Sequence, residues 1–127
     1  MGGIVRTPLS VAMTGTHDTE PIAVWWESLT PQERMRFGSE SPQFDAMVRD
    51  RILAILYNAG SNLVLLPIQD VFGWRDRINL PATISDTNWT FVLPWPCDNM
   101  TEQPDAIERA HMLAGWSYQT GRWHTAE

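Results

Sequence analysis

Two short apolar runs have the length and the boundaries of buried β-strands. Residues 9–14 read LSVAMT and are followed by Gly15, and residues 62–67 read NLVLLP. A continuous apolar run of this length is typical of a parallel strand that is covered on both faces. The pattern therefore predicts two parallel strands, with the residues between them forming the crossover connection.

Three segments between these runs carry apolar residues at helical spacing. The first starts near Pro21, which suits the first turn of a helix because its missing N–H would have no partner there. The second starts at Thr30, which forms a capping-box pattern with Glu33. The third is a longer amphipathic helix between Ser41 and Gly60. Strands and helices together predict a βαβ unit and the α/β fold class.

The rest of the chain predicts a long loop followed by one helix. Residues 73–96 carry many turn-forming residues, with a Pro- and Trp-rich stretch from residue 88 onward, and little regular structure is expected there. Thr101 to Pro104 then open a helix with apolar residues at three- and four-residue steps, which is expected to end before Gly115. We expect residues 1–127 to form a single unit.

Composition narrows the classes of partner. The formal net charge is -6, and no basic stripe is present that could neutralise a nucleic-acid backbone or an anionic bilayer. No run approaches the ~20 apolar residues of a membrane span, and the start does not resemble a signal peptide. Cys97 is the only cysteine, which excludes an internal disulfide and favours a reducing compartment. We therefore expect a cytoplasmic protein without nucleic-acid or membrane partners.

Polar side chains follow both predicted strands at the point where each strand ends. His17 and Asp18 come after the first strand, and Gln69 and Asp70 come after the second. Because ligands of parallel sheets and barrels bind beyond the C-terminal ends of the strands, these four side chains are expected to face one crevice. A capping or turn role is more common for any one of them, but their coincidence at two equivalent strand ends favours a site.

The residue types favour recognition of a neutral polyol over a metal site or a nucleophile. A metal site needs further ligands, and His111 and His124 lie far along the chain without a ligand spacing. No nucleophile elbow is visible, and Cys97 lacks the neighbours of an activated thiolate. Sugar hydroxyls, in contrast, require a carboxylate acceptor, an imidazole donor, an amide and an aromatic face close together. No metal or other cofactor is therefore expected.

Tryptophan is frequent enough to supply such an aromatic face. The chain has seven, at positions Trp25, Trp26, Trp74, Trp89, Trp95, Trp116 and Trp123. Large aromatic side chains more often fill a core than bind a ligand, so most of them are expected to be buried. Only their position in the fold can single out a sugar-binding one.

Four ordered blocks carry a family resemblance. They are Thr14-Gly-Thr-His-Asp-Thr19 with Trp25-Trp26-Glu27, then Gln69-Asp-Val-Phe-Gly73, then Arg77-Ile-Asn-Leu-Pro-Ala-Thr83, and finally Asn88-Trp89. In order and spacing, these blocks resemble the end of a 4-α-glucanotransferase of the amylomaltase, or disproportionating-enzyme, type. The resemblance implies the C-terminal part of a TIM (β/α)8 barrel. It also implies a glycosyltransferase of carbohydrate metabolism, which passes α-1,4-glucan segments between maltooligosaccharides with retention of configuration.

The resemblance also implies roles for individual residues. Asp18 would hold the hydroxyls of the sugar at the cleavage point and stabilise an oxocarbenium-like transition state. His17 would donate a hydrogen bond to the same ring. Gln69 and Asp70 would end the eighth barrel strand and bind substrate, and Asn79 would lie in the loop that lines the glucan path.

The resemblance places both catalytic carboxylates on earlier barrel strands, which have no counterpart in these 127 residues. Retaining chemistry needs a nucleophilic carboxylate and an acid/base carboxyl about 5 Å apart. We therefore expect negligible transfer by the chain alone, and exposed sheet edges that favour self-association or a partner carrying the missing part of the barrel. Three interpretations stay open: part of a split or truncated enzyme, a non-catalytic glucan-binding module, and an inert assembly piece.

Overall fold

The computed structural model describes residues 9–122, so Trp123 and His124 lie outside the described range. The elements in chain order are β1 (Val11–Met13), α1 (Ile22–Glu27), α2 (Pro31–Met35), α3 (Ala46–Tyr57), β2 (Leu63–Leu65), α4 (Ile68–Phe72), the 3-10 helix η1 (Cys97–Glu102) and α5 (Pro104–Gln119). In this part of the chain, no helix is both long and apolar enough to cross a membrane.

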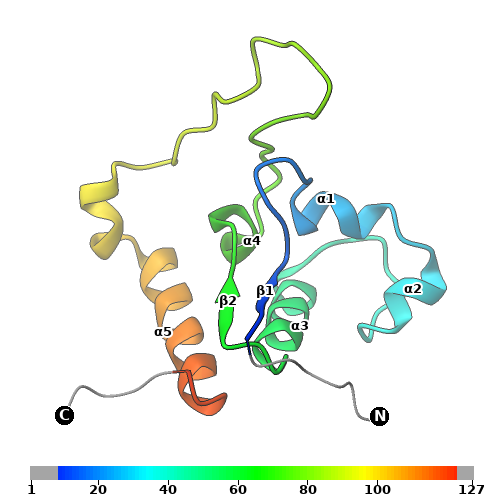
Figure 1. Ribbon diagram of the computed structural model, residues 1–127, viewed down its shortest axis with the longest axis vertical. Helices are drawn as coiled ribbons and strands as arrows, with labels where there is room; N and C mark the ends of the chain where they lie inside the picture. The colour runs from blue at the N-terminus through cyan, green and yellow to red at the C-terminus, as the bar shows by residue number, and fades with distance from the viewer. Residues whose placement is uncertain (1–8, 123–127) are drawn as a thin grey trace.

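The two predicted strands are present and lie side by side at the centre of the molecule (Figure 1). β1 pairs with β2 in parallel, with Val11 opposite Leu63. Both strands are shorter than the apolar runs that predicted them. A turn begins soon after Gly15, and Pro67, which has no N–H for a ladder, directly precedes α4. The α/β fold class is confirmed.

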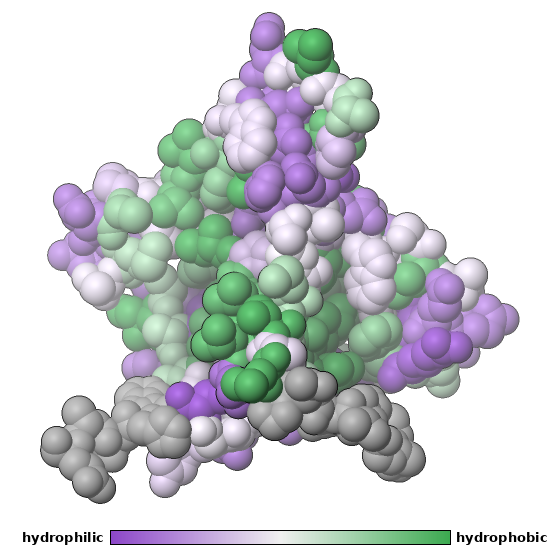
Figure 2. All heavy atoms as spheres, in the orientation of Figure 1, coloured by the Kyte–Doolittle hydropathy of each residue, from purple (hydrophilic) through white to green (hydrophobic). Residues whose placement is uncertain are grey.

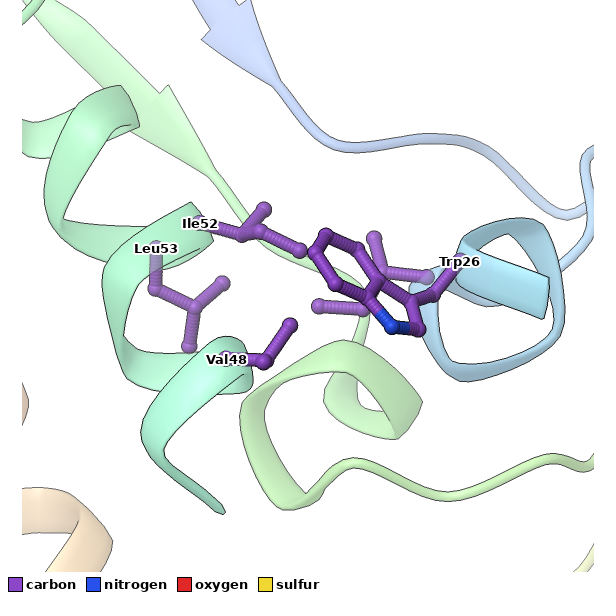
Figure 3. Close-up of a cluster of buried hydrophobic side chains, with 5 residues drawn as sticks. Trp26, Val48, Ile52 and Leu53 are labelled. Carbon is purple, nitrogen blue, oxygen red and sulfur yellow. The ribbon is translucent and has the colours of Figure 1, made fainter. Parts of the chain in front are cut away.

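The main hydrophobic core lies between α1 and α3. Trp26 of α1 is fully buried and points toward Val48, Ile52 and Leu53 of α3 (Figure 3). Its indole N–H donates to the carbonyl of Ser41 at 3.0 Å, so the polar atom of the ring has a partner inside the core. This packing fixes α1, and with it the turn that precedes α1, against the crossover helix.

Side-chain caps define where α2 and α3 begin. At the start of α2, Thr30 Oγ1 accepts from the N–H of Glu33 at 3.2 Å, and Glu33 Oε2 accepts from the N–H of Thr30 at 2.8 Å. This reciprocal pair confirms the predicted capping box. Asp45 caps α3, because its Oδ1 accepts from the N–H of Val48 at 2.8 Å.

Both long helices end elsewhere than predicted. α3 ends at Tyr57, before the expected Gly60. α5 continues through Gly115 to Gln119, and the chain leaves it at Gly121, whose φ of 76° is the left-handed conformation common after a helix. A glycine inside a helix costs only about 1 kcal/mol, and the tryptophan that follows Gly115 packs against the core, so the helix continues.

Arg109 joins α5 to the rest of the fold. Its side chain is buried, its Nε donates to the carbonyl of Val71 in α4 at 2.8 Å, and its Nη2 lies 2.9 Å from Asp50 Oδ1 in α3. A buried charge is tolerated when it is paired in this way. The contacts therefore hold α3, α4 and α5 in one arrangement.

One face of the β1–β2 pair is open. The side chains of Val11, Met13, Leu63 and Leu65, here called the exposed strand face, are 43% to 57% exposed. Apolar atoms gather over the middle of the molecule, where the two strands lie (Figure 2). Residues 9–122 do not cover both faces of the strands, which agrees with the expectation that this part of a barrel leaves sheet surface for further elements to cover. An apolar surface of this kind usually marks a place that another element or chain covers.

Candidate functional site

The turn that follows β1 is held by hydrogen bonds among its own residues. The N–H of Thr16 donates to Thr19 Oγ1 at 2.8 Å, and the N–H of Asp18 donates to Thr16 Oγ1 at 3.2 Å. Gly15 permits this close approach, since a Cβ there would lie 2.3 Å from Thr19 Oγ1. The turn presents His17 and Asp18 at the surface, with 54% and 48% of their side chains exposed.

The long loop after α4 brings Asn79 against this turn. Figure 1 shows the loop, coloured yellow-green, beyond the C-terminal ends of β1 and β2. Asn79 Nδ2 donates to Asp18 Oδ1 at 2.8 Å, and the N–H of Asn79 donates to the carbonyl of His17 at 3.2 Å. His17 Nε2 lies 3.3 Å from Asp18 Oδ2. The structure therefore brings His17, Asp18 and Asn79 together; we call these three residues the polar cluster.

Two residues that the sequence analysis did not single out complete the surroundings of the polar cluster. Arg77 Nη2 donates to the carbonyl of Asp18 at 2.7 Å and Arg77 Nε donates to the carbonyl of Asn79 at 2.8 Å, which fastens the loop to the turn. The ring of Trp89 lies 5.2 Å from the ring of His17, centroid to centroid. Both residues belong to the blocks that carry the family resemblance. No periodic pattern marks them, because they lie in an irregular loop.

Gln69 and Asp70 lie in a different place. They belong to the first turn of α4 and do not end β2, because the strand stops at Leu65 and the carbonyl of Pro67 accepts the first helical hydrogen bonds. The two residues are only 4% and 1% exposed. The single crevice expected for all four strand-end residues is therefore not what the structure describes, and contact of Gln69 or Asp70 with a ligand stays a prediction.

The carboxylate of Asp70 has structural partners. Its Oδ1 accepts at 2.9 Å from the N–H of Ile22, the first residue of α1, which has no partner within its own helix. Its Oδ2 accepts from the hydroxyl of Thr14, directly after β1. Burial raises the pKa of Asp70 above its ordinary value, and the two hydrogen bonds oppose this rise. Asp70 thus ties β1, α1 and α4 together beneath the turn.

A cavity of about 790 Å³ opens beside Asp18. Asp18 and Arg77 contribute polar groups to its wall, and Met13 of β1, Trp25 of α1 and Ile55 of α3 are among the apolar residues that line it. A mostly apolar wall with a few polar groups is typical of a ligand site. No group of three side chains suited to a metal ion gathers anywhere in residues 9–122.

The polar cluster suits recognition of hydroxyl groups. The carboxylate of Asp18 keeps lone pairs beyond those that Asn79 uses, and the imidazole of His17 and the amide of Asn79 add donors and acceptors at the same place. An indole ring lies next to them. A sugar ring offers hydroxyls to the polar groups and C–H groups to the indole, so it matches the chemistry of this surface.

The chain is similar in sequence to known 4-alpha-glucanotransferases. The family profile described as 4-alpha-glucanotransferase matches residues 6–97. The chain is 30% identical over 99 residues to the 4-alpha-glucanotransferase of Chlamydia muridarum and 25% identical over 111 residues to the chloroplastic/amyloplastic one of Arabidopsis thaliana. These matches cover 66% and 83% of this chain and 19% of each relative, so the chain spans about a fifth of their length.

A solved structure has a similar fold. The amylomaltase from Streptococcus agalactiae in complex with acarbose superposes with a TM-score of 0.68 at 25% sequence identity, and the match covers 93% of this chain and 23% of that one. The predicted correspondence with part of an amylomaltase fold is confirmed. The chain belongs to the 4-alpha-glucanotransferase family, glycoside hydrolase family 77.

Proposed function

We propose that this chain supplies a sugar-binding part of a 4-α-glucanotransferase active site, with Asp18 as its central group. The observation that supports this most directly is the polar cluster, in which an exposed carboxylate lies between an imidazole and an amide. In the proposal, these groups hold the hydroxyls of one glucose ring of an α-1,4-glucan or maltooligosaccharide. The complex of the similar amylomaltase with acarbose supports this class of ligand.

Asp18 acts in this proposal by stabilising positive charge and not by attacking the sugar. An ionised carboxylate held close to a reacting ring favours an oxocarbenium-like transition state over the neutral ground state. Retention of configuration also requires a nucleophile and an acid/base carboxyl about 5 Å apart. The family resemblance assigns both to other barrel strands. The 127 residues alone are therefore expected to bind glucan without transferring it.

The proposal includes a partner for the exposed strand face. Its four apolar side chains are 43% to 57% exposed, and β1 pairs only with β2 among the described residues. An open strand edge beside an apolar face favours pairing with a further strand. We propose that the remaining strands of the barrel, carrying the two catalytic carboxylates, fill this place. A second copy of the chain is the competing occupant, because it presents the same apolar face.

Titration with maltoheptaose, followed by tryptophan fluorescence, tests the binding role. The wild-type chain is expected to bind, and Asp18→Ala is expected to weaken affinity at least about tenfold, because a hydrogen bond to a charged group is worth about 1.5–3 kcal/mol. Asp86→Ala removes an exposed aspartate from the long loop and serves as the matched control, with unchanged affinity. Equal binding by Asp18→Ala and wild type would refute the role of Asp18. Absence of binding in every variant would favour the inert assembly piece.

Product analysis after incubation with maltotriose tests the catalytic half of the proposal. The chain alone is expected to yield no longer or shorter glucans. Addition of a polypeptide that carries the remaining barrel strands is expected to restore transfer, and the same mixture with Asp18→Ala is expected to stay inactive. A ladder of products from the chain alone would contradict the proposal, because it would require a nucleophile within these residues.

A further inference from the structure

Trp89 is exposed in a backbone conformation that a bulky residue rarely adopts. Its φ of 63° lies in the left-handed region, which costs a non-glycine residue about 1–2 kcal/mol. The residue is 63% exposed, so little burial offsets this strain. Residues held in such conformations cluster at ligand-binding and catalytic sites.

Contacts at the base of the loop hold Trp89 beside the polar cluster. Its N–H donates to the carbonyl of Ile78 at 2.7 Å, and the side chain of the preceding Asn88 accepts from the N–H of Leu80 at 3.1 Å. The two ends of the loop are therefore joined at the residue that carries the indole. The centroids of the Trp89 and His17 rings are 5.2 Å apart and the rings are inclined by 37°, so the indole lies next to the groups proposed to bind hydroxyls.

The other tryptophans of the described residues have different surroundings. Trp26 is fully buried in the core, Trp116 packs against the core, and Trp74 stacks on Phe72 with ring centroids 4.5 Å apart. Within residues 9–122, Trp89 is the only exposed tryptophan. Core packing does not explain its position, and the aromatic contact that it makes is with His17 of the polar cluster.

We propose that Trp89 is the aromatic platform on which a glucose ring of the glucan stacks while Asp18 and His17 bind its hydroxyls. This inference rests on the proposed function. A pyranose ring presents an apolar face of C–H groups, and an indole offers a large, rigid area to it at a low cost in side-chain entropy. Trp89 is in this role a binding residue, which sets the plane of the ring and so directs its hydroxyls toward the polar cluster.

Calorimetric titration with maltoheptaose tests the platform. Trp89→Ala removes the ring but still places a residue with a Cβ at the left-handed position, and it is expected to weaken affinity about tenfold. Trp89→Phe keeps a smaller ring and is expected to weaken affinity about threefold. Tyr118→Ala removes an aromatic residue of α5 that is 74% exposed, and it is the control with unchanged affinity. Saturating maltoheptaose is also expected to shift the NMR resonance of the Trp89 indole N–H.

The outcomes separate the platform from the proposed function. If wild type does not bind, or if Asp18→Ala binds as wild type does, the proposed function fails and the platform fails with it. If wild type binds, Asp18→Ala is weakened and Trp89→Ala is not, only the platform is refuted. If Trp89→Ala does not fold, as judged by its urea unfolding curve, the indole resonance of the wild type decides: an unchanged resonance at saturation refutes the platform.

Discussion

Removal of the Asp70 side chain should destabilise the fold through two identifiable groups. Asp70 itself is only 1% exposed. Asp70→Ala removes the carboxylate that accepts from the N–H of Ile22 and from the hydroxyl of Thr14. The N–H of Ile22 is buried, and leaving it without a partner costs about 1–3 kcal/mol. The hydroxyl of Thr14 is only half-buried and can turn to water, so the free energy of unfolding should fall by about 1–3 kcal/mol in total, less the relief of a desolvated carboxylate. Asp70→Asn is the matched variant, because its amide can accept from Ile22 and donate to Thr14.

Urea unfolding followed by tryptophan fluorescence measures this difference, since Trp26 is fully buried in the native state. Asp70→Asn should stay within about 1 kcal/mol of wild type, and Asp70→Ala should unfold at a clearly lower urea concentration. Similar stability of the two variants would refute the structural role. If Asp70→Asn instead kept its stability but lost affinity for maltoheptaose, the predicted substrate contact of Asp70 would be supported.

The pH dependence of stability gives an independent test of the same carboxyl. Burial raises the pKa of Asp70 in the folded protein above its ordinary value of 3.8. At a pH between the ordinary and the raised pKa, the folded protein therefore holds a proton that the unfolded chain has released. The contribution of Asp70 is therefore complete below the ordinary pKa and is lost as the pH rises through the folded-state pKa. Relative to Asp70→Asn, wild type should lose stability over this window, and a difference that does not vary with pH would contradict the argument.

Three further predictions concern other parts of the chain. Thr30→Ala removes the capping box of α2 and should lower the free energy of unfolding in urea by about 1 kcal/mol; an unchanged midpoint would mean that the cap is not needed. Ala82→Gly should raise the free energy of unfolding by up to about 1 kcal/mol, because the φ of 60° at Ala82 strains any residue with a Cβ. A loss of stability in this variant would contradict that strain. Leu65→Lys places a charge on the exposed strand face and should reduce self-association in sedimentation velocity toward the 14.5 kDa monomer; an unchanged mass distribution would exclude this face as the contact.

Local signals in the sequence were sufficient for most elements of the fold. The capping box at Thr30 and Glu33 and the two apolar runs depend on neighbouring residues only, and the structure contains the helix and both strands that they predicted. Helix ends were less predictable. Gly115 resembled an end, but one glycine costs a helix only about 1 kcal/mol, and the adjacent tryptophan packs against the core in the continued helix.

The candidate site depends on contacts between distant residues, which local patterns do not encode. Asp18 and Asn79 are 61 positions apart and meet because a loop without regular structure folds back over the first turn. The family resemblance, and not periodicity, put Asn79 among the candidates. Gln69 and Asp70 show the opposite case: their place after a strand suggested an exposed crevice, but Pro67 starts a helix that turns both side chains inward.

The polar cluster is held by hydrogen bonds, and the exposed strand face consists of apolar side chains. Glucan binding and glucan transfer are therefore expected to respond differently to a partner on that face. The polar cluster is held by hydrogen bonds within the chain, through Arg77, Asn79 and the turn at Thr16. None of these bonds involves the four side chains of the exposed strand face. Covering that face should therefore raise the stability of the chain while leaving the hydrogen bonds of the polar cluster in place, although Met13 of that face also lines the cavity beside Asp18. Transfer of glucan segments, in contrast, should appear only when the remaining barrel strands are added, since transfer needs the two carboxylates that those strands would carry.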